Sequence, residues 1–400
     1  MSLQLRARQG LLEVRIEDSE SKGRPTRIVV KAPGPPDFYT VKIRPESGFD
    51  SAREIQIGDA SFDSEFFIEG PVQLVSALLD AEMRRLLSSV NTLGEFELSS
   101  GELRVDLSDE QVPDALPFLL DLGKRFAAPL DVPRRLAENA KQDTYPEVRL
   151  HNLLLLLREL PENPVTAEAL RAACSDRSPE VRLRAAKELG AEGRGILMEL
   201  ANGLENDTVS AQAVSALERE LPFERTRTIL DHALSRGRLQ TARVCLESIG
   251  RSGDDDAVDV LANVMEQEDG ELAPDAAQAL GATGSPAAEP PLILALQREQ
   301  ADLRVAAANA LGRVGSVAAV LPLKETADRF LLGEIRRAAR QAIAEIQSRV
   351  QGASPGQLSL AGAEAGQLSL AQTEAGQLSL TEDPAGQLSL PPEERSPWPK

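Results

Sequence analysis

The chain has 400 residues, of which 42% are hydrophobic, and a formal net charge of −19 at pH 7. Its length predicts two or three regions, each able to bury a core of its own. The acidic balance argues against nucleic acid as a direct partner, because phosphate binding needs clustered Lys and Arg. The longest aliphatic run, residues 153–157, is far too short to cross a bilayer, so no membrane partner is expected.

Cysteine and histidine are scarce. Cys174 and Cys245 lie far apart within apolar helical patterns and are expected to be small core residues in a reducing cytoplasm. His151 and His232 leave little for zinc chemistry or for a Ser/His/Asp arrangement. Residues 1–14 lack the sustained apolar stretch of a signal peptide. These features predict a soluble cytoplasmic protein with no catalytic residue, no cofactor and no metal.

Residues 1–130 read as a small α+β domain. Eight of the ten phenylalanines fall in this region, and strands and helices follow one another in blocks, not in strict alternation. A hairpin over 96–98 and 103–107 is expected to turn at Ser100 and Gly101. The other predicted strands are 12–16, 28–30, 39–43, 54–57 and 66–68, and the predicted helices are 72–90 and 112–128.

Residues 55–70, IQIGDASFDSEFFIEG, carry a G-D-x-x-F-D-x-x-F pattern that resembles a bacterial domain of unknown function. The resemblance implies no activity. Asp59 and Asp63 could hold a metal or act as an acid/base pair. We favour a turn-forming Asp59 after its glycine and a solvated Asp63 between two buried phenylalanines.

Residues 131–350 repeat one pattern, best seen in SPEVRLRAAKELG over 178–190. Ser178 can cap a helix, Pro179 suits its first position, and Gly190 lies where a helix stops. The apolar arc of this helix is wider than a single stripe, so it must touch neighbours on two sides. The pattern recurs about every 31 residues, which is the signature of a solenoid. Its copies begin near Pro146, Pro179, Thr208, Thr241, Leu272, Leu303 and Glu334.

PEVRLRAAKELG and DLRVAAANALG resemble HEAT repeats of the short bacterial type that is also found in phycobilisome lyases. The resemblance implies a mainly α fold: a HEAT-type α-solenoid of about seven helix pairs, an ARM-like superhelix. Pro274 is expected to delay the start of its helix, and Pro290-Pro291 to interrupt the next one. The run Asp254 to Asp256 could bind a metal, but capping of the helix that follows is favoured.

Residues 351–400 contain GQLSL four times, ten residues apart, between spacers that cannot build a core, so this tail is expected to be disordered. Gln-Leu-Ser-Leu resembles the core of the bacterial peptide that binds the sliding clamp, which implies a linear binding motif. The candidate binding residues are Gln357, Leu358, Leu360, Gln367, Leu368, Leu370, Gln377, Leu378, Leu380, Gln387, Leu388 and Leu390.

Three functions are compatible with these patterns. The leading hypothesis is a non-enzymatic scaffold that binds a protein partner on the concave face of the solenoid. The alternative is a replication or repair accessory that the GQLSL tail recruits to the sliding clamp. The third, weighted least, is an enzyme like the phycobilin lyases, by analogy of fold alone.

Overall fold

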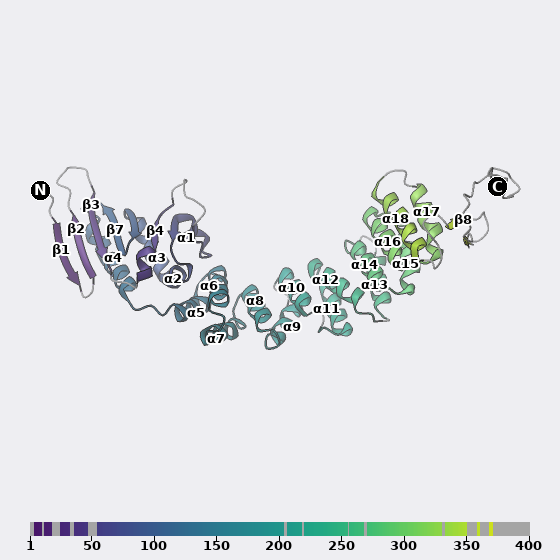
Figure 1. Cartoon of the computed structure of the whole chain (residues 1–400), viewed down its shortest axis with the longest axis horizontal. Coiled ribbons are helices and arrows are strands. Elements are labelled where there is room, and N and C mark those ends of the chain that lie inside the picture. The colour runs from purple at the N-terminus through teal and green to yellow at the C-terminus, as the bar shows by residue number, and fades with distance from the viewer. Residues whose placement is uncertain are drawn as a thin grey trace, which may run out of the picture. The chain divides into compact units, whose positions relative to one another are not determined.

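Figure 1 shows the fold of the chain in a computed structural model. The chain forms two compact units, Met1–Ile249 and Gly250–Lys400. The structure describes residues 4–9, 12–17, 25–32, 36–46, 54–203, 206–217, 220–254, 256–267, 270–329, 333–349, 358–360 and 368–370.

The N-terminal unit begins with an antiparallel sheet of seven strands in the order β1-β2-β3-β7-β6-β4-β5. The hairpin between β6 and β7 turns as predicted: Ser100 and Gly101 take the positive φ values of 55° and 72° that such a turn requires. The strands are β1 (Gln4–Gln9), β2 (Leu12–Glu17), β3 (Thr26–Lys31), β4 (Lys42–Pro45), β5 (Phe66–Glu69), β6 (Glu95–Ser99) and β7 (Glu102–Leu107).

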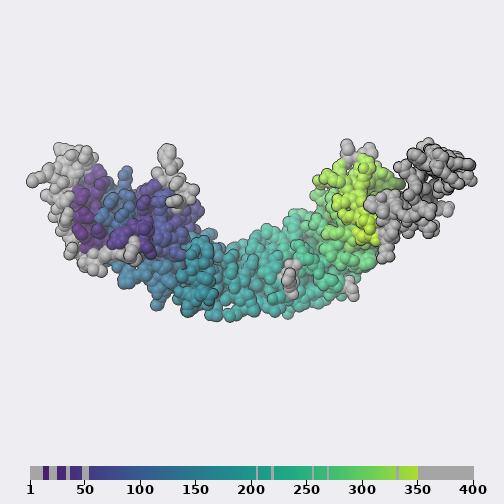
Figure 2. Space-filling model, in the orientation of Figure 1, coloured from purple at the N-terminus to yellow at the C-terminus, as the bar shows by residue number. Residues whose placement is uncertain are grey.

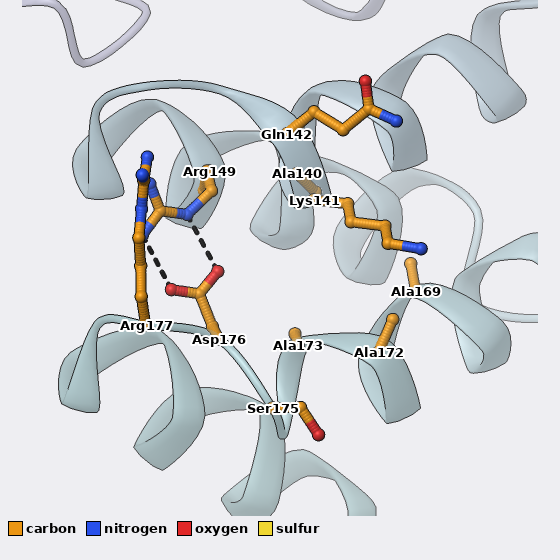
Figure 3. A pocket seen from close by; sticks show the side chains of 10 residues that line it. All are labelled: Ala140, Lys141, Gln142, Arg149, Ala169, Ala172, Ala173, Ser175, Asp176 and Arg177. Carbon is orange, nitrogen blue, oxygen red and sulfur yellow. Dashed lines mark hydrogen bonds and ion pairs between the residues drawn. The ribbon is translucent and has the colours of Figure 1, made fainter.

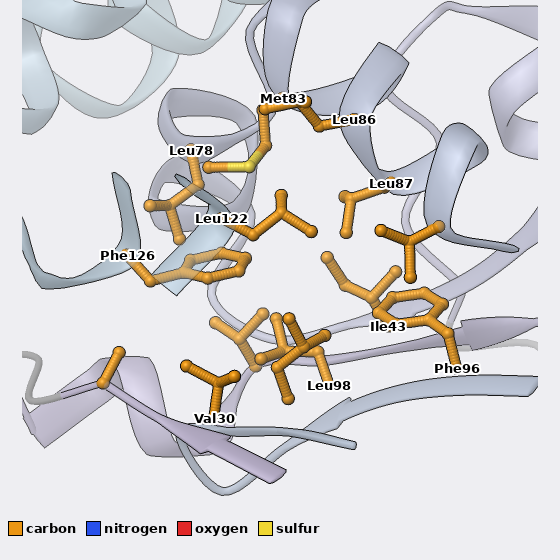
Figure 4. Close-up of a cluster of buried hydrophobic side chains, with 14 of the residues drawn as sticks. Val30, Ile43, Leu78, Met83, Leu86, Leu87, Phe96, Leu98, Leu122 and Phe126 are labelled. Carbon is orange, nitrogen blue, oxygen red and sulfur yellow. The ribbon is translucent and has the colours of Figure 1, made fainter. Parts of the chain in front are cut away.

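Four helices accompany the sheet, and a core of buried apolar side chains fills the space between α3, α4 and one sheet face (Figure 4). Met83 and Leu87 of α3 and Phe126 of α4 meet Val30 and Leu98 of the sheet in this core. The other face of the sheet carries ion pairs such as Arg27 with Asp106 (2.6 Å). The helices are α1 (Ala60–Glu65), α2 (Val72–Leu78), α3 (Ala81–Asn91) and α4 (Val112–Ala127), and a 3₁₀ turn spans Pro36–Thr40.

Three predicted elements differ from the structure. Residues 54–57 are not a strand, although the Ile55 N–H donates to the Ile68 carbonyl at 2.9 Å. The predicted strand 39–43 starts only at Lys42, because the 3₁₀ turn runs to Thr40. The predicted helix 72–90 is broken, because Asp80 caps a new helix by accepting from the Met83 N–H at 2.8 Å.

In the part of residues 131–350 that the structure describes, fourteen helices, α5 to α18, follow one another as seven successive pairs, as predicted. In each unit the surface is a succession of colour bands, because each pair packs mainly on its neighbours in sequence (Figure 2). The pairs are α5 (Val132–Gln142) with α6 (Pro146–Glu159), α7 (Pro164–Ala173) with α8 (Pro179–Leu189), α9 (Arg194–Asn202) with α10 (Asp207–Leu217), α11 (Phe223–Ser235) with α12 (Leu239–Arg251), α13 (Ala257–Glu266) with α14 (Ala273–Ala282), α15 (Glu289–Ala295) with α16 (Ala301–Val314), and α17 (Val320–Arg329) with α18 (Glu334–Arg349).

The start of α8 follows its predicted capping signal, but the predicted capping by the run at 254–256 is wrong, because Asp256 at the N-cap of α13 makes no side-chain capping hydrogen bond. The Ser178 side chain accepts from the Val181 N–H at 3.4 Å, and Pro274 lies in the first turn of α14. The prediction that Pro290 and Pro291 interrupt a helix is wrong. Both lie in the first turn of α15. The first turn tolerates them because its N–H groups have no intrahelical acceptor.

The glycines near the ends of the second helices have a different role from the one predicted for Gly190. Gly190 does end α8, with φ +54° and open space around it. Gly250, Gly281 and Gly312 instead lie inside α12, α14 and α16, at intervals of 31 residues. A Cβ on Gly281 would lie 2.7 Å from the Cα of Ala310, so glycine is what lets α14 and α16 touch. This close contact makes the row α14, α16, α18 the tightly packed side of the C-terminal unit.

Candidate functional site

The α+β domain is fastened to the first repeat by a buried arginine. Arg84 of α3 is 3% exposed. Its Nε donates to Asp59 at 2.8 Å, and its two terminal nitrogens donate to the Asp143 carboxylate at 2.9 and 3.0 Å. Burial lowers the pKa of Arg84, but the hydrogen bonds and charges of Asp143 and Asp59 outweigh this effect, so the pKa is raised. The cluster is therefore an ionised structural junction.

The G-D-x-x-F-D-x-x-F pattern serves this same junction. Gly58 has φ +95°, and a Cβ there would lie 2.9 Å from the Glu147 carbonyl carbon of α6. Asp59 caps α1 by accepting from Phe62 at 3.2 Å. The prediction that Asp63 is solvated is wrong. Asp63 is half-buried, and it accepts from the N–H groups of Ile57 and Gly58 at 3.0 Å each. Its pKa is raised because burial outweighs these two hydrogen bonds.

A second buried arginine continues the junction into the repeats. Arg149 of α6 is 1% exposed, and its guanidinium donates two hydrogen bonds of 2.8 and 2.7 Å to the Asp176 carboxylate. Its remaining nitrogen donates to the carbonyl of Asp143 at 3.0 Å. Asp143 thus receives Arg84 on its side chain and Arg149 on its backbone, which links the α+β domain to two successive repeats.

The arginine of the repeated motif has one structural role in three copies. Arg149, Arg182 and Arg304 each donate to a carbonyl six residues earlier, at 3.0, 2.9 and 2.9 Å. These carbonyls belong to the turn that precedes each second helix, where backbone acceptors lack helical partners. The motif arginines are therefore used within the stack.

Beside the Arg149–Asp176 pair lies a cavity of about 340 Å³ between α5, α7 and the turn after α7 (Figure 3). Alanine methyl groups form part of its walls, and the rest is polar: Lys141, Gln142, Ser175 and Arg177 line it beside the ion pair. Arg177 also donates to the Thr144 carbonyl at 2.7 Å. Lys141 and Arg177 give this cavity two cations besides Arg149, so it suits a small anionic group.

Other titratable groups have structural surroundings. The Ser76 hydroxyl lies 3.0 Å from Nε2 of His151, whose pKa is lowered by burial and by the charge of Arg158. Cys245 is buried, which raises its pKa to about 12.

The run at 254–256 behaves as a local turn. The Asp256 N–H donates to the side chain of Asp254 at 3.1 Å, and the Ala257 N–H donates to the Asp254 carbonyl at 3.2 Å. Asp255 lies outside the described residues. Within the part of the chain that the structure describes, no three His, Cys, Asp or Glu side chains come close enough to hold a metal ion.

Only part of the tail falls within the described residues. Residues 358–360 and 368–370 form the short strands β8 (Leu358–Leu360) and β9 (Leu368–Leu370), which pair antiparallel with Leu358 opposite Leu370. The expected disorder of residues 351–357, 361–367 and 371–400 concerns positions that are not described. Eight of the candidate binding residues also lie outside the described residues: Gln357, Gln367, Gln377, Leu378, Leu380, Gln387, Leu388 and Leu390.

Comparisons with known proteins bear on the helical array. The HEAT repeats family matches residues 263–344, and no curated protein matches the chain. Among similar solved structures, the CpcE–CpcF complex of phycocyanin lyase from Nostoc sp. PCC7120 is 19% identical, with 55% of this chain and 96% of that chain covered and a TM-score of 0.30. Human deoxyhypusine hydroxylase is 17% identical, with 54% of this chain and 96% of that chain covered and a TM-score of 0.25.

An engineered protein is 20% identical, with 46% of this chain and 96% of that chain covered and a TM-score of 0.33. Such low scores carry no argument about activity or partner. In the described residues, every helix is too short or too polar to cross a membrane. The family match over residues 263–344 and the helix pairs within each unit show that the helical array is a HEAT-type α-solenoid.

Proposed function

We propose that the chain is a non-enzymatic scaffold that binds a protein partner on the row of second helices. The observation that supports this most is the close packing of α14, α16 and α18 through Gly281 and Gly312, as expected for the inner row of a curved helical array. HEAT arrays generally use such concave surfaces to hold proteins. The free thiols of Cys174 and Cys245 favour a reducing cytoplasm as its location.

Three equivalent positions mark the centre of this surface. Gln278, Asn309 and Arg340 follow one another at intervals of 31 residues, one on each of α14, α16 and α18, and all three are exposed. Each is flanked along its helix by residues that pack on neighbouring helices, so these side chains point away from the stack. The three side chains differ in chemistry from repeat to repeat, as is needed for a surface that binds one partner specifically.

The test is site-specific photo-crosslinking with the full chain in cells. A photoreactive phenylalanine at each of these three positions should trap the same protein, and one at exposed Lys324 of α17 should not. Equal capture from Lys324, or no common protein from the three positions, would refute the proposal. The lyase-like alternative predicts instead that the purified chain takes up bilin colour.

An alternative proposal assigns partner choice to the tail. Two of the four LSL segments are extended strands, which is the conformation in which a short motif fits an apolar pocket. In each copy the residue after LSL is Ala361, Ala371, Thr381 or Pro391, which weakens the match to the clamp-binding peptide. A labelled peptide of residues 351–400 should bind a bacterial clamp, and the same peptide with its GQLSL leucines changed to alanine should not. Indistinguishable titrations would exclude the clamp.

A further inference from the structure

The C-terminal unit has an apolar groove on the row formed by the first helices of its pairs, α13, α15 and α17. This row is not the surface proposed above. A hollow of about 400 Å³ opens between α13 and α15, within the size range of ligand sites. Buried Met265 and Leu303 form part of its wall together with Pro291. Leu294 also lines it and is 61% exposed, more than any other large apolar side chain in the described part of the chain. Covering Leu294 and the apolar wall of the hollow with another apolar group would remove both from water, which is favourable.

The edge of the groove carries hydrogen-bonding groups. Gln297 and Arg298 line it directly after α15. One terminal nitrogen of Arg298 donates to the Glu266 carbonyl at 3.2 Å, which holds the end of α13 in place. The Gln297 amide and the other N–H groups of Arg298 can bond to the carbonyl groups or a hydroxyl of a bound peptide. The groove therefore suits a short extended peptide whose apolar side chains alternate with small polar ones.

We propose that this groove binds the third GQLSL segment of the chain's own tail, residues 376–380. In an extended segment of this sequence the two leucines point to one side and Gln and Ser to the other. The leucines would enter the groove beside Leu294, and the polar side chains would face its edge and the solvent. The LSL segments of the first two copies are paired with each other as β8 and β9, so the third copy is the first one that remains to fill it.

The tail is long enough to reach the groove. It leaves the array after Arg349, whose guanidinium donates to the Gly315 carbonyl at 2.7 Å, just beyond the end of α16. Leu303, in the groove wall, lies in the first turn of the same helix. Leu303 and Gly315 are therefore about 18 Å apart along the axis. Leu358 and Leu370 lie opposite each other in β8 and β9, so the reach comes from two shorter stretches. Leu358 follows Arg349 by 9 residues and Leu378 follows Leu370 by 8 residues, and together these stretches span up to about 55 Å when extended.

The test compares the full chain with a full-chain variant in which all eight leucines of the four GQLSL copies are alanine. The probe is a fluorescein-labelled peptide of residues 374–382, read by anisotropy. The variant should bind the peptide about tenfold more tightly than the natural chain, where the tethered copies compete at high effective concentration. Adding Leu294→Asp to the variant should abolish binding. Adding Leu321→Asp, a leucine of α17 that is 43% exposed and not part of the groove, should not.

Each other result overturns the proposal. Equal affinity for both chains would show that the tail does not occupy the groove, and no binding to the variant would show that the groove does not accept the segment. Equal losses from Leu294→Asp and Leu321→Asp would place binding elsewhere. Circular dichroism of each variant confirms the fold, and both substitutions are at exposed positions.

Discussion

The close contact between α14 and α16 can be tested by one methyl group. In Gly281→Ala, the new Cβ would lie 2.7 Å from both the Cα and the Cβ of Ala310. A backbone atom cannot rotate away, so the two helices must separate. Alanine improves helix propensity by up to ~1 kcal/mol, whereas overpacking a close contact costs about 1–3 kcal/mol. We expect a net loss of up to about 2 kcal/mol, since the gain in helix propensity offsets about 1 kcal/mol of the overpacking cost.

Two other glycines supply matched controls. Gly195 of α9 has nothing within 4 Å of an added Cβ, so Gly195→Ala should be neutral or stabilising by up to ~1 kcal/mol. A Cβ on Gly312 would meet chiefly the carboxylate of Glu345, a side chain that can move, and the Ala342 Cα at 3.2 Å. Gly312→Ala should therefore cost less than Gly281→Ala.

Urea denaturation followed by far-UV circular dichroism gives the order of stability, and amide hydrogen exchange of α14 and α16 locates the change. Gly281→Ala should speed exchange in both helices. If Gly281→Ala stabilises the chain as much as Gly195→Ala does, then α14 and α16 are not in contact through this glycine, and the tightly packed side of the C-terminal unit is assigned wrongly.

Three further predictions concern the N-terminal unit. Arg84→Met should cost about 3–5 kcal/mol in a thermal or urea melt, because it leaves two buried carboxylates without their cation, whereas exposed Arg85→Met should change little. Since the pKa of His151 is lowered, the folded state resists its protonation, so the free energy of unfolding should fall as the pH drops below about 6.5, and His151→Gln should reduce that fall in pH-dependent melts. Because burial raises the pKa of Cys245 to about 12, iodoacetamide should modify half-buried Cys174 first and Cys245 only on unfolding; equal rates in peptide mapping would contradict its burial.

The repeats were predictable from the sequence because their signals are local. The apolar arc, the capping serine and the prolines each act within one helix, and the 31-residue period multiplies them. The hairpin at Ser100 and Gly101 was predictable for the same reason, since only a few residues decide a tight turn.

Elements decided by distant contacts were not predictable. The leucines of α2 and α3 face one core and continue a single helical period, so the break at Asp80 is hidden in the pattern. Ile55 and Ile57 alternate like a strand because both are buried, yet this segment lies outside the sheet. The junction of Arg84 with Asp143 joins residues 59 positions apart, and nothing in the sequence pairs them.

The same contrast separates the residues that build the stack from those available to a partner. The repeated arginines donate to the turn carbonyls of their own repeats, and the repeated glycines admit the next helix, so these positions are fully used by the fold. Positions 278, 309 and 340 have the same spacing but carry Gln, Asn and Arg, because packing does not constrain an exposed side chain. What recurs from copy to copy specifies the solenoid, and what differs at exposed positions of the inner row is free to specify its partner. Substitutions at those three positions should therefore change partner capture without lowering stability, whereas substitutions at the glycines should do the reverse.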